Sequence, residues 1–176
     1  MNLAQRRLIM NTFIFSQFGY CPLVWMFHGR KLNNRINNIH ELALRIIYRD
    51  YKSTFKQLLK QNKSVSIHQR NLQILATEIF KTGNGLNPVI MEDVFNFKNL
   101  AYNFRNVETL NRSNVSSVKY GTETITSLGA KIWKILPNDY KELTSLSTFK
   151  SKIKNWETDK CPCRLCKSYI QRVDFI

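Results

Sequence analysis

The chain of 176 residues is long enough for one domain of ordinary size, and its 43% hydrophobic content excludes a disordered polypeptide. Its 27 Lys and Arg against 12 Asp and Glu give a net charge of +15, which favours a polyanionic partner, nucleic acid before an anionic membrane. No apolar run long enough for a membrane span and no secretory signal are visible, so we expect an intracellular protein, nuclear or cytoplasmic, with reduced thiols.

The first half of the chain predicts helices with short breaks between them. Residues 3–18 are apolar nearly all round and predict a helix buried on several sides. Most of the six aromatic residues between positions 13 and 27, Phe13 among them, are expected in the core. Cys21, which precedes Pro22 at the start of a short helix, is predicted as a buried structural cysteine. Residues 32–49 predict an amphipathic helix. Its expected apolar stripe consists of Leu32, Ile36, Ile39, Ala43 and Ile46.

Further helices are predicted on both sides of an irregular segment. A short helix capped by Ser53 precedes a longer one over residues 66 to about 81, which begins with a capping box. Its predicted buried stripe consists of Leu72, Leu75, Ala76 and Ile79, and its predicted solvent side of Arg70, Gln73, Thr77 and Lys81. Residues 96–122 predict a loop or hairpin that links a helical domain, 1–95, to a C-terminal extension, 123–176, with helical spacing over 125–135 and 145–156.

The residues that metal-dependent phosphoryl transfer needs are absent from this sequence. Such enzymes hold their ions with clustered carboxylates, but only Glu92 and Asp93 are adjacent, at a predicted helix start. The "GNG" at 83–85 lacks the Lys-Ser/Thr of a phosphate-binding loop. The histidines His28, His40 and His68 lie far apart and are not expected to bind a metal, and a partly buried, hydrogen-bonded imidazole is the expected role of His40. The chain is therefore not expected to be an enzyme.

Three blocks of sequence resemble one family when they are taken together. The blocks are "TFIFSQFGYCPLVWMFHGRKLNNRINNIHELALRIIYRDYKSTF", "YGTETITSLGAKIWKILPNDYKELTSLSTFKSKIKNW" and "CPCRLCKSYIQRVDFI". They resemble the region downstream of the polymerase palm in reverse transcriptases of LINE-type, non-LTR retrotransposons. The resemblance implies a thumb-like helical bundle with a C-terminal extension, cut away from an RNA-directed DNA polymerase. The palm carboxylates, which bind magnesium in that family, and its endonuclease have no counterpart here.

A polymerase thumb grips a template–primer duplex by its backbone, which requires basic residues without base readout. The candidate cations for this contact with RNA, DNA or a hybrid are Arg30, Lys31, Arg35, Arg45, Arg49, Lys52, Lys150, Lys154, Arg164 and Lys167. The alternative for each is a solvated charged surface. The missing palm is the second expected partner, and apolar surface that it would cover predicts self-association of the chain alone.

Three of the four cysteines, Cys161, Cys163 and Cys166, form a C-x-C-x2-C pattern near the C-terminus. Structural zinc takes four ligands, and no fourth Cys or His follows. A reduced basic tail and a zinc site completed elsewhere therefore both remain open. Two alternatives to nucleic-acid binding also remain: an inactive retroelement remnant or protein-interaction module, and a small zinc-binding module.

Overall fold

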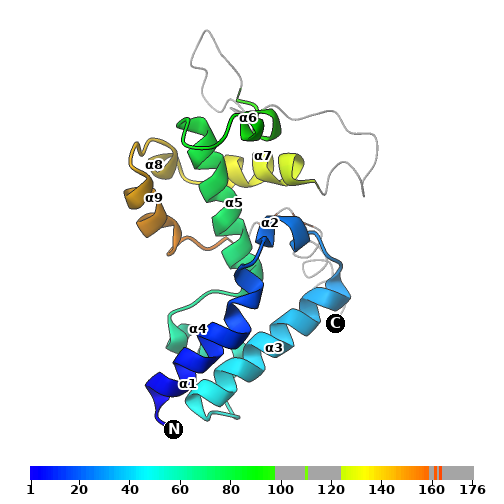
Figure 1. Ribbon diagram of the computed structural model, residues 1–176, viewed down its shortest axis with the longest axis vertical. Coiled ribbons are helices and arrows are strands. Elements are labelled where there is room, and N and C mark those ends of the chain that lie inside the picture. Colours follow the sequence, from blue (N-terminus) through cyan, green and yellow to red (C-terminus); the bar gives the residue numbers. More distant parts are fainter. Residues whose placement is uncertain (98–109, 111–123, 159–160, 162, 164–176) are drawn as a thin grey trace, which may run out of the picture. The chain divides into compact units, whose positions relative to one another are not determined.

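The computed structural model describes residues 1–97, 110, 124–158, 161 and 163, and it is mainly α-helical, as predicted (Figure 1). By its internal contacts the chain divides into two compact units, Met1–Asn71 and Leu72–Ile176, here called unit 1 and unit 2. The division falls within one continuous helix, α5 (Ile67–Gly83). The predicted linker, residues 96–122, falls almost wholly outside the described residues, so the predicted domain division stays a prediction.

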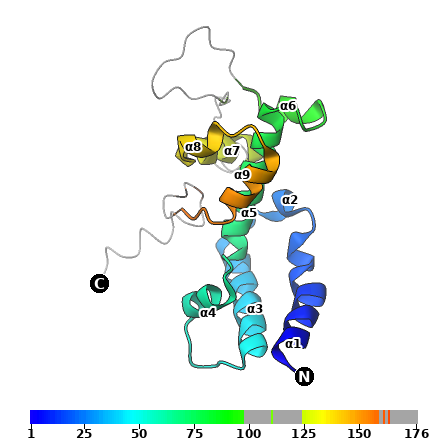
Figure 2. The same cartoon turned by 90° about the vertical axis from the view of Figure 1, so that its left-hand side faces the viewer.

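Unit 1 is built around one long helix, α3, which lies between α1 and α4 (Figure 2). Its elements are α1 (Leu3–Ile9), the π-helix η1 (Met10–Phe15), the 3-10 turn η2 (Gln17–Gly19), α2 (Pro22–Trp25), α3 (Arg30–Tyr48) and α4 (Phe55–Asn62). Leu44 and Ile47 of α3 and Leu58 of α4 are fully buried in its core. Burying side chains of this size contributes about 1.5–3 kcal/mol each, so α3 is the helix on which unit 1 depends most.

The first helical segment is far more exposed than the sequence predicts. Neither α1 nor η1 has a buried residue, and Phe13 is 70% exposed. Arg6 fastens α1 to α3, because its Nε donates to the carbonyl of Ile47 at 2.8 Å. The prediction of burial on several sides is therefore wrong, since α3 covers only one side of this segment. Cys21 is also exposed, with a left-handed backbone (φ 41°), so its prediction as a buried cysteine is wrong too.

Helix α3 confirms the predicted amphipathic helix but buries a different face. Its buried residues are Asn33, Ile36, His40, Ala43, Leu44 and Ile47. Leu32 and Ile39 of the predicted stripe are instead exposed. Apolar residues occur on more than one side of this helix, so hydropathy alone does not identify the side that α1 and α4 cover. The covered side includes two polar residues, Asn33 and His40, which a hydropathy pattern places in solvent.

Helix α4 starts one residue later than predicted because Thr54, not Ser53, caps it. The Gln57 backbone N–H donates to Thr54 Oγ1 at 3.4 Å, and the Thr54 N–H donates to Gln57 Oε1 at 2.8 Å. This reciprocal pair is a capping box. At the start of α5 the predicted cap is confirmed, because the Gln69 N–H donates to Ser66 Oγ at 3.2 Å.

The described part of unit 2 contains four shorter helices and the part of α5 that follows Asn71. They are α6 (Ile90–Val94), α7 (Ile125–Ile135), α8 (Asn138–Lys141) and α9 (Leu146–Ile153). The predicted stripe of α5 is confirmed, since Leu72, Leu75, Ala76 and Ile79 are all fully buried. The ring of Phe80 stacks on that of Phe149 in α9, with centroids 4.1 Å apart, which contributes about 0.5–1.5 kcal/mol beyond burial.

Gln73 shows how a polar residue is used in the core of unit 2. It was predicted on the solvent side of α5, but it is buried, and so is Thr77. Gln73 Nε2 donates to the carbonyls of Lys154, at 3.2 Å, and of Trp156, at 2.9 Å. These hydrogen bonds supply a donor for carbonyl groups at the C-terminal end of α9 and just after it, and they hold the segment that follows α9 against α5.

Candidate nucleic-acid interface

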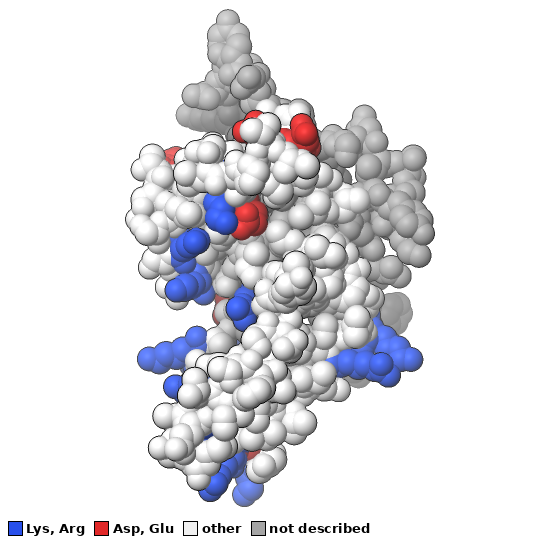
Figure 3. Space-filling model, viewed as in Figure 1, with Lys and Arg blue, Asp and Glu red and all other residues white. Residues whose placement is uncertain are grey.

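Most of the excess positive charge belongs to unit 1. Residues 1–71 include 12 Lys and Arg but only two acidic residues, Glu41 and Asp50, so they contribute +10 of the net charge of +15. Blue Lys and Arg side chains accordingly lie along several margins of this unit (Figure 3). A cationic surface of this density attracts polyanions over about 8–10 Å at moderate salt.

The N-terminal end of α3 gathers three of the predicted cations. Arg30 and Lys31 lie in its first turn and Arg35 one turn later; Lys31 and Arg35 are exposed, and Arg30 is half-buried. This turn contains no acidic residue, and Gly29 offers no side-chain cap. Because the N-terminus of a helix carries a partial positive charge, cations there are unfavourable by about 0.3–1 kcal/mol each. A bound phosphate would relieve that repulsion.

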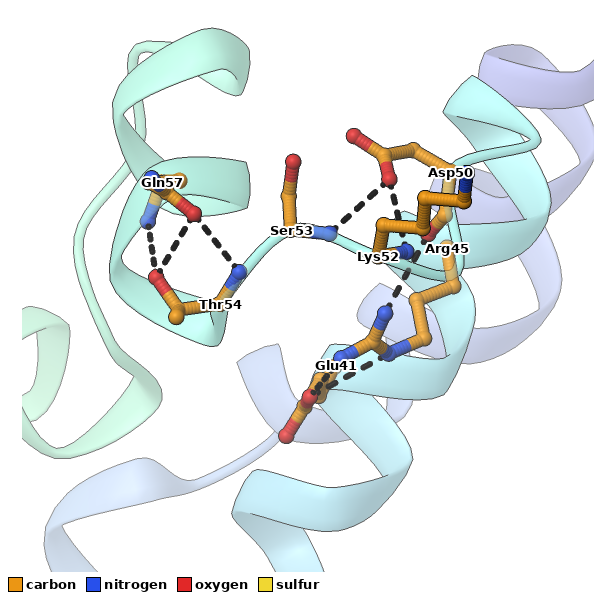
Figure 4. Close-up of polar contacts among 7 residues, drawn as sticks. All are labelled: Glu41, Arg45, Asp50, Lys52, Ser53, Thr54 and Gln57. Atoms are coloured by element: carbon orange, nitrogen blue, oxygen red, sulfur yellow. Dashed lines mark hydrogen bonds and ion pairs between the residues drawn. The ribbon is translucent and has the colours of Figure 1, made fainter.

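The C-terminal end of α3 presents two more cations on an ordered loop, residues 49–53, called here the 49–53 loop. Arg49 ends the helix in a left-handed conformation (φ 55°), and its N–H donates to the Arg45 carbonyl. The Asp50 carboxylate accepts from the backbone N–H groups of Lys52 and Ser53, both at 3.0 Å (Figure 4). Arg49 and Lys52 are exposed, so their charges face solvent from a fixed backbone.

Arg45 differs from its neighbours because its guanidinium already has partners. Nη2 lies 2.6 Å from Glu41 Oε1 in an ion pair, and Nη1 donates to the Asp50 carbonyl at 3.3 Å (Figure 4). The side chain of Arg45 therefore links Glu41 of α3 to the 49–53 loop. The prediction that Arg45 itself binds phosphate stays a prediction.

Asp50 remains ionised as part of the same arrangement. Hydrogen bonding from the side chain of Ser53, then from the backbone N–H groups of Ser53 and Lys52, lowers the pKa of its carboxyl group, and Arg45 contributes to the same shift. With Glu41 paired to Arg45, both carboxylates of unit 1 hold the loop in place. Glu41 and Asp50 therefore make their contacts near the C-terminal end of α3 and do not neutralise the cations at its N-terminal end.

The remaining predicted cations belong to the second half of the chain. Lys150 lies on α9 and Lys154 follows it, and both are exposed. Arg164 and Lys167 lie outside the described residues. The structure therefore places the predicted cations in groups at the two ends of α3 and on α9, and the nucleic-acid role of each group stays a prediction.

Beside the cations, unit 1 carries an apolar surface that its own helices leave open. Leu8, Phe13, Tyr20 and Val24 are each more than 60% exposed, and together they define what we call the uncharged face. Figure 3 shows a mostly white surface over α1 and α2. The prediction that most aromatics of residues 13–27 form the core is wrong, because the six aromatic residues of this segment are all exposed or half-buried.

His40 is the one strongly perturbed base among the described residues of α3. Its ring packs edge-on against Phe15, at 5.0 Å between centroids, and against Phe55, at 5.3 Å. Burial, and to a smaller extent the nearby charge of Arg70, lower the pKa of His40 from 6.5 to about 4. Its Nδ1 has no hydrogen-bond partner in the described part of the chain. His40 is thus a neutral core residue, not the hydrogen-bonded imidazole that was expected.

Two of the three predicted metal-binding cysteines lie among the described residues. Cys161 is buried and Cys163 is half-buried, and both are free thiols. Thiolates are ligands that zinc prefers, and the zinc role of these two residues stays a prediction. Cys166 lies outside the described residues.

Comparison with models of protein families, with curated proteins and with solved structures finds no match to this chain. In residues 1–97 and 124–158, every helix is too short or too polar to traverse a lipid bilayer.

Proposed function

We propose that unit 1 binds the phosphate backbone of nucleic acid without reading its sequence. One observation carries this proposal. Both carboxylates of unit 1 are occupied by contacts near the C-terminal end of α3, so they do not pair with the exposed cations of the same unit. The cations concerned are Lys31, Arg35, Arg49 and Lys52, and none of them joins an ion pair within the described residues. The described residues contain no recognisable base-reading module, so affinity would depend on charge and not on sequence.

We further propose that the chain is a non-catalytic C-terminal piece, thumb and extension, of a LINE-type reverse transcriptase. The support is the resemblance of the three sequence blocks and the mainly α architecture. In this proposal the chain contributes a grip on template and primer, and the missing palm contributes the magnesium-binding carboxylates. Chelator-sensitive nucleotide incorporation by the purified chain would contradict it.

Salt-titrated binding to an RNA–DNA hybrid duplex tests the proposed contact. If the chain contacts about six to eight phosphates, the logarithm of its binding constant falls with the logarithm of salt concentration, with a slope of about −5 to −7. Duplexes of different sequence should bind alike. A flat and weak signal would instead favour an inactive remnant or a protein-interaction module.

A pair of double variants locates the contact within unit 1. Replacing Arg35 and Lys52 by Gln removes one exposed cation from each end of α3. This variant should make the salt slope less negative by about 2, because each lost phosphate contact contributes about 0.9. Lys56→Gln with Lys60→Gln removes the same charge from exposed positions of α4 and serves as the control. Equal effects of both pairs would show that α3 is not the contact.

The thiols of Cys161 and Cys163 favour zinc binding as a second candidate function. We propose zinc because thiolates are ligands that it prefers, and Cys163 is only half-buried, so an ion has access. Metal analysis of the purified chain should find bound zinc that Cys161→Ser and Cys163→Ser each remove. Cys21→Ser is the matched control, since this thiol is exposed and distant in sequence from the other two. Zinc content that survives both substitutions would contradict the proposal.

We propose that the uncharged face contacts the palm that precedes the thumb in the resembling family. Its open apolar side chains would then be covered by protein instead of solvent. The chain alone should therefore self-associate once salt screens its positive charge. A monodisperse monomer across a salt series in sizing experiments would count against a partner at this face.

A further inference from the structure

The 49–53 loop exposes an aromatic ring that the fold of unit 1 does not use. Tyr51 is 69% exposed, and in the described part of the chain it has no hydrogen bond, ring contact or ion pair. Its neighbours on the loop include the exposed cations Arg49 and Lys52. An aromatic ring left in water loses the favourable burial that such a side chain usually gains, so its position calls for a role other than packing.

The backbone that carries this ring is held by contacts on both sides of it. Before Tyr51, the Asp50 carbonyl accepts from Arg45, whose guanidinium is fixed by Glu41. After it, the N–H groups of Lys52 and Ser53 donate to the Asp50 carboxylate (Figure 4). The loop is therefore ordered before any ligand arrives, and binding would not have to supply the free energy of ordering it.

An open ring between two cations matches the chemistry of one nucleotide. The flat face of a base stacks on an aromatic side chain, and the phosphates on either side of that base pair with cations. A base inside a duplex has both faces covered by its neighbours, so it offers no face to Tyr51. The matching ligand is therefore a nucleotide that is unpaired, in a single strand or where a strand leaves a duplex.

We infer that Tyr51 is a stacking site for an unpaired base, and that Arg49 and Lys52 hold the phosphates beside it. This inference rests on the proposed nucleic-acid binding of unit 1 and adds a ligand class to it. Stacking tolerates any base, because every base has a π-face, so the site selects single strands without selecting sequence. The proposed grip on a duplex and this site would together favour a template–primer junction with an unpaired overhang.

The test compares the full chain with its Tyr51→Ala variant on three probes at one salt concentration. The probes are a single-stranded oligonucleotide, an abasic strand of the same length and charge, and a blunt duplex. Tyr51→Ala should weaken binding to the single strand by about 5- to 150-fold, the range for loss of one stacked base. It should leave binding to the abasic strand and the duplex unchanged. Its salt slope should equal that of the unaltered chain, because no charge is removed.

Two further variants separate stacking from general effects of the substitution. Tyr51→Phe keeps the ring and should keep single-strand affinity. Leu86→Ala removes an apolar side chain that is also exposed, at 54%, but has Gly85 and Asn87 as neighbours in place of cations, and it should leave single-strand affinity unchanged. Circular dichroism of each variant checks that its helices are intact.

The outcomes distinguish this inference from the proposal on which it rests. If the unaltered chain binds both strands and duplex with a steep salt slope but Tyr51→Ala changes nothing, the stacking site is refuted and backbone binding stands. Equal losses on the single strand and the abasic strand also refute stacking. If the unaltered chain binds none of the probes, both proposals fall.

Discussion

Lowering the pH should destabilise unit 1 through a single residue, His40. This side chain is buried between Phe15 and Phe55, and burial lowers its pKa from 6.5 to about 4. In the unfolded chain the imidazole takes up a proton near pH 6.5, whereas in the folded chain it resists protonation until about pH 4. The unfolded state therefore binds more protons between these values, and acid shifts the equilibrium towards it.

The expected size of the effect follows from the two pKa values. Stability from the neutral His40 is complete above pH 6.5 and is lost progressively as the pH falls towards 4. One pKa unit corresponds to 1.36 kcal/mol, so about 3 kcal/mol is at stake in total, and about 2 kcal/mol is lost by pH 5. A loss of this size is a large fraction of the stability of an ordinary domain.

Urea unfolding at pH 7, 6 and 5, followed by circular dichroism, measures this loss. His40→Leu keeps an apolar side chain at the site but cannot be protonated, so its unfolding free energy should fall about 2 kcal/mol less than that of the unaltered chain between pH 7 and pH 5. The other histidines are common to both proteins and cancel in the comparison. In addition, NMR should give a titration midpoint near 4 for the imidazole signal that His40→Leu removes. Parallel pH profiles, or a midpoint near 6.5, would refute the reasoning.

Three substitutions test the packing and capping contacts in the same unfolding assay. Thr54→Ala should cost about 1 kcal/mol as the loss of a helix cap, whereas Ser53→Ala should cost clearly less; the reverse order would contradict the assigned cap. Gly129→Ala should cost about 1–3 kcal/mol, because the added Cβ would lie 2.9 Å from the ring of Phe95. An unchanged urea midpoint would show that the Phe95 ring moves aside without loss of stability. Gln73→Leu should cost about 1–3 kcal/mol by leaving buried carbonyls without a donor, and a stabilised variant would argue against those hydrogen bonds.

The sequence by itself determined which segments are helical and where several of them begin. Spacing of apolar residues predicted α3, α5, α7 and α9, and the cap at Ser66 was recognised from its residue type. These features depend on contacts between residues three or four positions apart, which a pattern displays directly. The signal for Thr54 was also present, since Gln57 follows it by three residues, but Ser53 was chosen as the cap. The excess of cations over carboxylates was equally visible in composition.

Only the tertiary structure decided which faces are covered and which polar groups are already in use. His40 and Gln73 are polar residues that distant partners bury, so no local pattern could place them inside. The role of Arg45 depends on Glu41 and on the course of the chain after α3, although its charge is obvious in sequence. Tyr51 becomes a candidate binding residue only in the structure, where hydrogen bonds fix the backbone of its loop and its ring remains exposed. Burial and pairing are properties of contacts between segments, and those contacts exist only once the helices have packed.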